Sequence, residues 1–172
     1  MPFANNGNKE EAMSYVSLLK ACAKKKDLQR GMDVHSAMLE TAGGLLETNP
    51  FIGSSLIHMY AKCVDLTSAQ EVLDGLPVRN VVSWNALIAR YAEQGQGHVA
   101  LKCFKQMQIK GFSPDAVTFI CVLKACGILG AIEKAKQIHD DIINRGLLEN
   151  DIMLGNALVD MYALCNMLEK AH

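Results

Sequence analysis

The sequence lacks an excess of charge of either sign. Its 17 basic and 18 acidic residues leave a net charge of −1 over 172 residues. A protein that binds nucleic acid mainly through phosphate contacts is expected to carry a strongly basic surface. The composition therefore argues against that class of binder, but it does not exclude recognition through the edges of bases.

The sequence also lacks the common motifs of catalytic sites. It contains no G-x-x-x-x-G-K-[ST], no H-E-x-x-H, no G-x-S-x-G and no H-x-E with P-C-x-x-C. Residues 95–100 match G-x-G-x-x-A, but they join two predicted helices, and dinucleotide binding needs a preceding strand. We therefore expect this segment not to be an enzyme and to need no cofactor.

The six cysteines show neither C-x-x-C nor the Cys/His spacing of a zinc site. Five of them fall within helical patterns, which indicates small packing residues and a reducing compartment. His35 and His139 occupy equivalent places, and we expect them to be packing or surface residues. The first residues have the features of neither a signal peptide nor a transit peptide. The most apolar stretch, residues 116–132, is shorter than a bilayer span, so no membrane segment is predicted.

What the sequence has instead is internal repetition. Leu-Lys-Ala-Cys at residues 19–22 returns at residues 123–126, an offset of 104. Leu-Ile-His-Met-Tyr-Ala at residues 56–61 is similar to Leu-Val-Asp-Met-Tyr-Ala at residues 158–163, an offset of 102. A third variant lies at residues 84–92. Self-similarity at a period of about 20–50 residues indicates a stacked array of units, because a single unit cannot bury its own apolar face.

The repeats divide the chain into units of similar length. A disordered lead, 1–11, is followed by units 12–49, 50–80, 81–115, 116–151 and an incomplete unit 152–172. Each complete unit has apolar residues at helical spacing in two segments, which predicts a pair of antiparallel helices. The units close on Asn49, Asn80, Asp115 and Asp151, which are favoured residues for capping the next helix.

The last unit has a first helix, Ile152–Leu164, and only the start of a second helix from Leu168. We expect the chain to be truncated here. Leu158, Met161 and Tyr162 should then be partly exposed, and an exposed apolar end can drive self-association.

The chain resembles a pentatricopeptide repeat (PPR) protein of the plant subclass that cycles long, short and standard 35-residue units. Residues 81–88 (Val-Val-Ser-Trp-Asn-Ala-Leu-Ile) resemble the opening of a standard unit, residues 123–126 the long type, and residues 155–163 the short type. The resemblance implies long units at 12–49 and 116–151, a short unit at 50–80, a standard unit at 81–115 and an incomplete short unit at 152–172. The implied fold is all-α, a right-handed α-solenoid of antiparallel helix pairs.

The same resemblance implies binding of single-stranded RNA in mitochondria or chloroplasts, one base per unit, as part of an RNA editing or processing factor with editing-complex proteins as partners. In the family the fifth and last residues of a unit read a base, and the second residues of adjacent units hold it. The implied reading residues are Ser54, Asn80, Asn85, Asp115 and Asn156, and the implied holding residues are Phe51, Val82, Val117 and Met153. Ser54 with Asn80 implies adenine, and Asn85 with Asp115 implies uracil. The long units have Val16 and Ile120 in the reading position, and an apolar side chain cannot read a base edge.

The residues themselves agree with this in part. Ser54, Asn85 and Asn156 each lie three residues after an apolar holding residue, hence on the same helical face. Lys24 and Lys62, each the thirteenth residue of its unit, are candidates for phosphate contact, and the alternative that they are ordinary solvated lysines stays open. Two interpretations of the closing residues stay open, capping alone or capping with base reading. A second class of function also stays open, a helical-repeat scaffold that binds a peptide in its groove.

Overall fold

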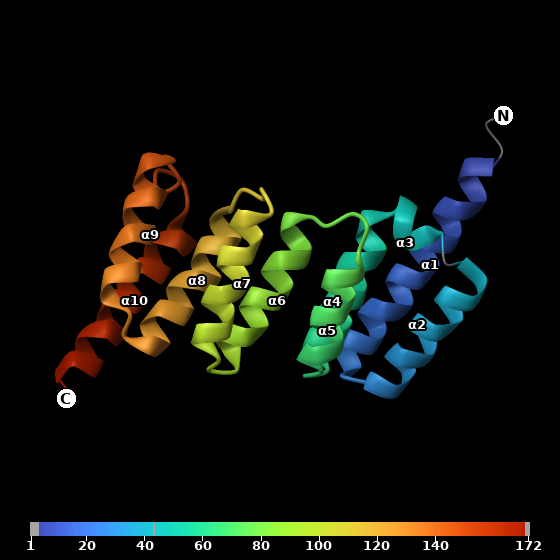
Figure 1. The fold of residues 1–172 in the computed structure, drawn as a ribbon, viewed down its shortest axis with the longest axis horizontal. Coiled ribbons are helices and arrows are strands. Elements are labelled where there is room, and N and C mark those ends of the chain that lie inside the picture. The colour runs from blue at the N-terminus through green and yellow to red at the C-terminus, as the bar shows by residue number, and fades with distance from the viewer. Residues whose placement is uncertain (1–3, 43, 171–172) are drawn as a thin grey trace. The chain divides into compact units, whose positions relative to one another are not determined.

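The structure, a computed structural model, describes residues 4–42 and 44–170, and within these residues every regular element is a helix (Figure 1). The predicted all-α array of helix pairs is confirmed. The chain forms two compact units, unit 1 (Met1–Leu87) and unit 2 (Ile88–His172), with the boundary inside helix α6.

Unit 1 contains α1 (Ala4–Lys25), α2 (Leu28–Ala42), α3 (Leu45–Thr48), α4 (Pro50–Lys62), α5 (Leu66–Gly75) and the first part of α6 (Val81–Glu93). Helix α1 packs against α2 and α4, and α4 also packs against α5. The core lies between these helices and includes fully buried Leu19, Met38, Ile52, Leu56 and Leu73.

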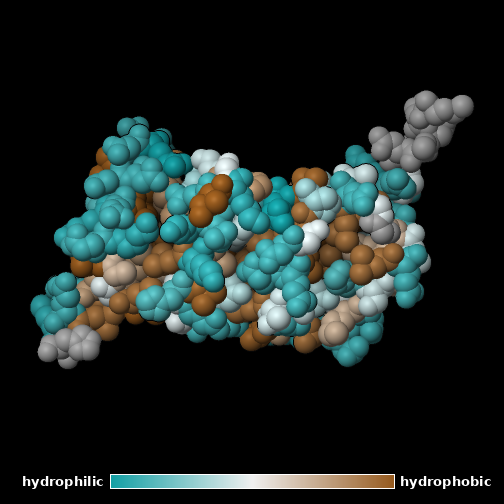
Figure 2. Space-filling view, in the orientation of Figure 1, coloured by the Kyte–Doolittle hydropathy of each residue, from teal (hydrophilic) through white to brown (hydrophobic). Residues whose placement is uncertain are grey.

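Unit 2 contains the rest of α6, α7 (Gly97–Ile109), α8 (Ala116–Leu129), α9 (Ile132–Asn144) and α10 (Ile152–Lys170). Helix α8 packs against α7, α9 and α10, so it is the centre of this unit. Its apolar residues Phe119, Val122 and Leu123 are fully buried. Hydrophobic side chains also reach the surface, where Figure 2 shows them scattered among hydrophilic ones.

Four first helices end in the same way. The fifteenth residue of each complete predicted unit has a positive φ, at Lys26 (54°), Val64 (69°), Gly95 (75°) and Gly130 (64°). This left-handed residue reverses the chain, so the second helix of the pair begins within three residues.

Helices α4, α6, α8 and α10 begin at residues 50, 81, 116 and 152, the first residues of the predicted units. The predicted capping is confirmed at each of these helices. The side-chain Oδ1 of the preceding residue accepts a hydrogen bond from a backbone N–H, at Asn49 (from Phe51, 3.0 Å), Asn80 (from Ser83, 2.9 Å), Asp115 (from Thr118, 2.9 Å) and Asp151 (from Leu154, 2.9 Å). These bonds satisfy backbone donors that the helix itself leaves unpaired.

Two expectations differ from the structure. The lead at residues 1–11 was expected to be disordered, but α1 begins at Ala4, and residues 1–3 lie outside the described part. Lys9, Glu10, Glu11 and Ala12 are strong helix formers, so helix propensity favours extending α1 backward as far as Lys9.

The last unit was expected to break after Leu164, but α10 continues to Lys170, and residues 171–172 are not described. In this unit Asn166 takes the fifteenth position and stays helical. Leu158 and Met161 are buried inside unit 2 rather than partly exposed. Of the three residues expected to be exposed, only Tyr162 is half-buried. Helix α8 covers this side of α10, which the sequence pattern alone did not reveal.

Candidate nucleic-acid interface

The second residue of each predicted unit presents an apolar side chain to solvent. The exposed fractions of these side chains are 60% for Met13, 70% for Phe51, 63% for Val82, 53% for Val117 and 68% for Met153. The residue that follows in α4, α6, α8 and α10 is fully buried in each case. The first turn of each helix therefore directs one side chain into the core and leaves its apolar neighbour outside.

Met13 was missed by the sequence reasoning, which named only the other four. The signal was present, since Met13 is the second residue of unit 12–49. It is an apolar residue at the same position as Phe51, with a similar exposure.

The predicted reading pair Ser54 and Asn80 is in direct contact. Ser54 Oγ lies 3.1 Å from Asn80 Oδ1, although the two residues are 26 positions apart, and 3.1 Å from the Pro50 carbonyl oxygen, so its single proton is shared between these two acceptors. Asn80 Oδ1 accepts the capping N–H of Ser83 as well. Both of these side-chain hydrogen bonds of Asn80 use Oδ1 rather than Nδ2. One residue thus serves as helix cap and as partner of Ser54.

The predicted pair Asn85 and Asp115 is divided between the two compact units, with Asn85 in unit 1 and Asp115 in unit 2. Asp115 is exposed and forms a capping box, because its backbone N–H donates to Thr118 Oγ1 (3.1 Å) while its Oδ1 accepts from Thr118. Asn85 has only 7% of its side chain exposed. A base can reach Asn85 only if this side chain becomes more accessible.

The remaining fifth positions differ in accessibility. Asn156 is exposed on α10, Ile120 is half-buried on α8, and Val16 on α1 has 8% exposure. The polar residue at this position is thus open to solvent in the last unit, while the apolar residues are partly or fully withdrawn.

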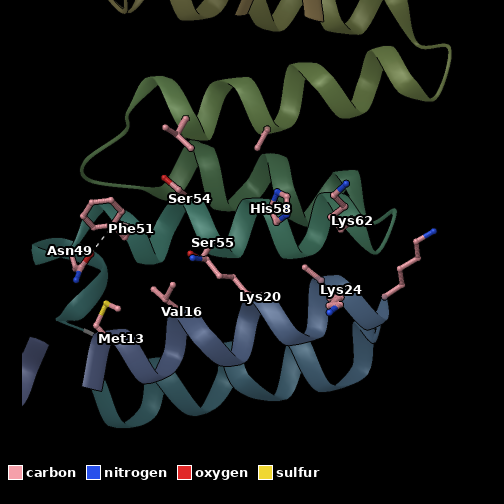
Figure 3. A pocket seen from close by; sticks show the side chains of 14 residues that line it. Met13, Val16, Lys20, Lys24, Asn49, Phe51, Ser54, Ser55, His58 and Lys62 are labelled. Carbon is pink, nitrogen blue, oxygen red and sulfur yellow. Dashed lines mark hydrogen bonds between the residues drawn. The ribbon is translucent and has the colours of Figure 1, made fainter. Parts of the chain in front are cut away.

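Unit 1 contains a groove of about 820 Å³ between α1, α4 and the start of α6 (Figure 3). Met13 and Phe51 lie at one end of it and Lys24 and Lys62 at the other, with Ser54 between the apolar end and the middle. The groove is apolar where α1 and α4 hold their second-position side chains, and basic toward the ends of both helices.

Lys24 and Lys62, the two lysines singled out by position, both line this groove. Lys20, Lys26 and His58 line it too, and the sequence reasoning did not name them. The lining residues include no aspartate or glutamate. Lys20 belongs to the repeated Leu-Lys-Ala-Cys phrase, which is the signal that could have identified it.

The cysteines lie outside this groove. Within the described residues all six are free thiols, four of them buried, and burial raises the pKa of Cys126 to about 11. No helix in the described ranges is long and apolar enough to cross a membrane.

Sequence signatures of known families match most of the array. The signature of the PPR repeat matches residues 13–40 and 117–147, and that of the PPR repeat family matches residues 79–128. The chain belongs to the pentatricopeptide repeat family. Its array of helix pairs is therefore an array of PPR repeats.

Curated relatives come from Arabidopsis thaliana. The chain is 39% identical over 158 residues to pentatricopeptide repeat-containing protein At2g13600, covering 92% of this chain and 22% of that protein. It is 38% identical over 171 residues to the chloroplastic PPR protein CRR2 (95% and 25%) and 37% identical over 155 residues to the mitochondrial PPR protein At3g09040 (90% and 15%). The chain spans about a quarter or less of the length of these relatives.

Solved structures show the same fold. PPR10 from maize superposes with a TM-score of 0.70 at 23% identity, covering 91% of this chain and 22% of that one. PPR10 in complex with an 18-nt psaJ RNA element superposes with a TM-score of 0.65 at 19% identity, covering 82% and 21%.

Proposed function

We propose that this chain binds single-stranded RNA, with each predicted repeat unit facing one base. The observation that carries the proposal is the exposed apolar residue at the second position of all five units. Exposed apolar side chains at regular intervals can hold unstacked bases, and a polar side chain three residues later on the same face can bond to a base edge. PPR10, which has the same fold, has been solved in complex with an 18-nt psaJ RNA element, and this gives RNA binding by the fold a precedent.

The proposed base preferences rest on the reading pairs. Ser54 with Asn80 favours adenine and Asn85 with Asp115 favours uracil, while the units with Val16 and Ile120 contribute no base identity. The unit lengths support assignment to the subclass with long, short and standard units. The hydrogen bond between Ser54 and Asn80 supports the first pair, since the two side chains are in direct contact.

The intact protein, in this proposal, is an RNA editing or processing factor of chloroplasts or mitochondria, and this segment recognises RNA without catalysing a reaction. Relatives named as chloroplastic and mitochondrial support the location. Editing-complex proteins are the proposed protein partners. Self-association through α10 is a further part of the proposal, supported by Val159, which is 68% exposed where the equivalent Ile57 is fully buried.

An exchange of reading pairs tests the base preferences. Ser54→Asn with Asn80→Asp should move the preference at that position from adenine toward uracil, and Asn85→Thr with Asp115→Asn should move the other position in the opposite direction. Asn and Asp cap helices about equally well, so neither change at the closing residue removes a cap. The measurement is a binding selection from a random single-stranded RNA pool.

Asn49→Asp is the matched control. Asn49 caps α4 as Asn80 caps α6. However, the repeat unit that Asn49 closes has Val16 in the reading position. The Asn49→Asp exchange should therefore leave the selected RNA sequence unchanged. Unchanged preferences in both exchanged proteins would contradict the base code. Binding to a peptide library with no binding to RNA would contradict the function itself.

A further inference from the structure

The ninth residue of each predicted repeat unit lies four residues after the reading residue, on the same face of the first helix. The ninth residues are Lys20, His58, Ala89, Lys124 and Asp160. Lys20 and His58 line the groove of unit 1, and Lys124 and Asp160 line a groove of about 510 Å³ between α8 and α10 in unit 2. Four of the five are thus polar residues that face a groove, whereas Ala89 has no side-chain group that can form a hydrogen bond.

His58 lies on α4 between Ser54 and Lys62 (Figure 3). At 1.5 Å per residue, it is about 6 Å along the helix from each of them. Ser54 belongs to the proposed reading pair, which faces the edge of a base, and Lys62 is the candidate for phosphate contact. In a nucleotide the ribose joins the base to the phosphate. The position of His58 along α4 therefore corresponds to the ribose.

Packing does not account for the histidine at this place. The neighbouring residues Ile57 and Met59 are fully buried, while His58 is exposed in the groove. In contrast, His35 is half-buried and hydrogen-bonds Tyr60. Histidine is also not among the strong helix formers. What it offers in the groove is an imidazole, whose two nitrogens provide one hydrogen-bond donor and one acceptor when the ring is neutral.

We propose that His58 hydrogen-bonds the ribose 2′-hydroxyl of the nucleotide that unit 50–80 reads, and that this contact lets the unit distinguish RNA from DNA. The 2′-hydroxyl is both a donor and an acceptor, and RNA has it where DNA does not. The inference rests on the proposed RNA binding and adds a choice of sugar to the choice of base. Because unit 81–115 has Ala89 in the ninth position, the nucleotide facing that unit lacks such a contact.

The test is a scan of single 2′-deoxy substitutions through a single-stranded RNA oligonucleotide selected by the wild-type protein. The nucleotide facing unit 50–80 is located by the exchange of its reading pair, Ser54→Asn with Asn80→Asp. A 2′-deoxy substitution there should weaken binding by about 2- to 12-fold, the contribution of one neutral hydrogen bond. The same substitution at the nucleotide facing unit 81–115 should have a smaller effect.

His58→Ala separates the hydrogen bond from other effects of removing the hydroxyl. This variant should bind the all-RNA oligonucleotide more weakly by a similar factor, and the 2′-deoxy substitution should then cause no further loss. Such non-additivity is expected of two groups in contact. A change in sugar conformation, in contrast, would weaken binding equally in both proteins. His98→Ala, at an exposed histidine of α7, is the matched control and should keep the wild-type response to the scan.

The outcomes separate this inference from the proposed function. An equal 2′-deoxy effect in wild type and His58→Ala, with RNA still bound and bases still selected, overturns the contact and leaves the proposed function standing. The absence of any 2′-deoxy effect at the nucleotide facing unit 50–80 in wild type also overturns it. A wild-type protein that binds no RNA overturns both. A 2′-deoxy effect that is lost only in His58→Ala, and only at this nucleotide, supports the contact.

Discussion

A histidine in the second helix of units 12–49 and 116–151 hydrogen-bonds a tyrosine in the first helix of the following unit. His35 Nδ1 lies 2.8 Å from Tyr60 Oη, and His139 Nδ1 lies 2.9 Å from Tyr162 Oη. In both pairs the rings meet edge to face with centroids 5.7 Å apart. The contact recurs because both the histidine and the tyrosine recur in the sequence. The same pair of residues therefore packs neighbouring repeat units together at both places.

The His35 pair predicts that acid weakens the fold. Burial lowers the pKa of His35, so the unfolded chain binds a proton near pH 6.5 while the folded chain does not. The free energy of unfolding must then fall as the pH falls below about 6.5. Burial, and to a lesser degree the charges of Asp65 and Cys63, raises the pKa of Tyr60, so its hydroxyl stays protonated throughout.

The measurement is urea unfolding between pH 5 and pH 7.5. His35→Gln should reduce the loss of stability on acidification relative to wild type. The comparison variant is His98→Gln on the exposed surface of α7. Equal pH dependence in wild type and His35→Gln would show that this histidine is not the group responsible.

The roles of side chains were predictable where the cause of the role is local in the sequence. The capping role of Asn80 and Asp115 depends on residues three positions away, and the structure has it as predicted. The burial of Asn85 and the convergence of Lys20 and Lys26 on the groove depend on neighbouring helices. A helical face read from spacing does not specify which helix covers it, so these features were not foreseen.

At the scale of the helices, the first helix of each complete unit ends one or two residues before the fifteenth residue, which has a positive φ. Glycine adopts the required positive φ easily, and Gly95 and Gly130 are such residues. Val64 adopts φ of 69° at the same position, which is strained for a β-branched side chain. Helix α5 nevertheless begins directly after it, capped by Asp65, whose Oδ1 accepts from the Ser68 N–H at 3.1 Å.

Val64→Gly should therefore stabilise the protein. The left-handed conformation costs a non-glycine residue roughly 1–2 kcal/mol, and glycine loses about 0.5–1 kcal/mol more entropy on folding, so a net gain of about 1 kcal/mol is expected. Val64 is 58% exposed, so little packing is lost. Thermal and urea unfolding measure the change.

Val99→Gly is the control for this substitution. Val99 is also partly exposed but lies inside helix α7, where glycine is unfavourable, so this variant should be less stable than wild type. Destabilisation by both substitutions would contradict the role assigned to the conformation of Val64.

Helix boundaries followed the unit pattern for most first helices, while α1 begins ahead of its unit, at Ala4. Helices α4, α6, α8 and α10 begin where the unit pattern predicted. The end of α10 did not follow the pattern, because the helix continues through Asn166, the fifteenth residue of its unit.

At the scale of the whole molecule, each helix contacts partners near it in sequence. In unit 1 the chief contacts of α1 are with α2 and α4, and in unit 2 those of α8 are with α7, α9 and α10. In an array of this kind the stability is approximately a sum over units and their nearest-neighbour interfaces. Damage to one core should therefore stay local.

Leu19 and Leu123 allow a matched test of this locality. They are the first residues of the two copies of Leu-Lys-Ala-Cys, both are fully buried, and they lie in unit 1 and unit 2 respectively. Replacing a buried leucine by alanine costs about 2–5 kcal/mol through lost apolar contact and the cavity left behind. We expect Leu19→Ala to lower amide hydrogen-exchange protection in α1, α2 and α4, and Leu123→Ala to lower it in α7, α8 and α10. Each variant is the control for the other, since the substitution and the burial are identical. A uniform loss of protection across both units in either variant would mean that the chain unfolds as a single cooperative body, and the additive description of the array would be wrong.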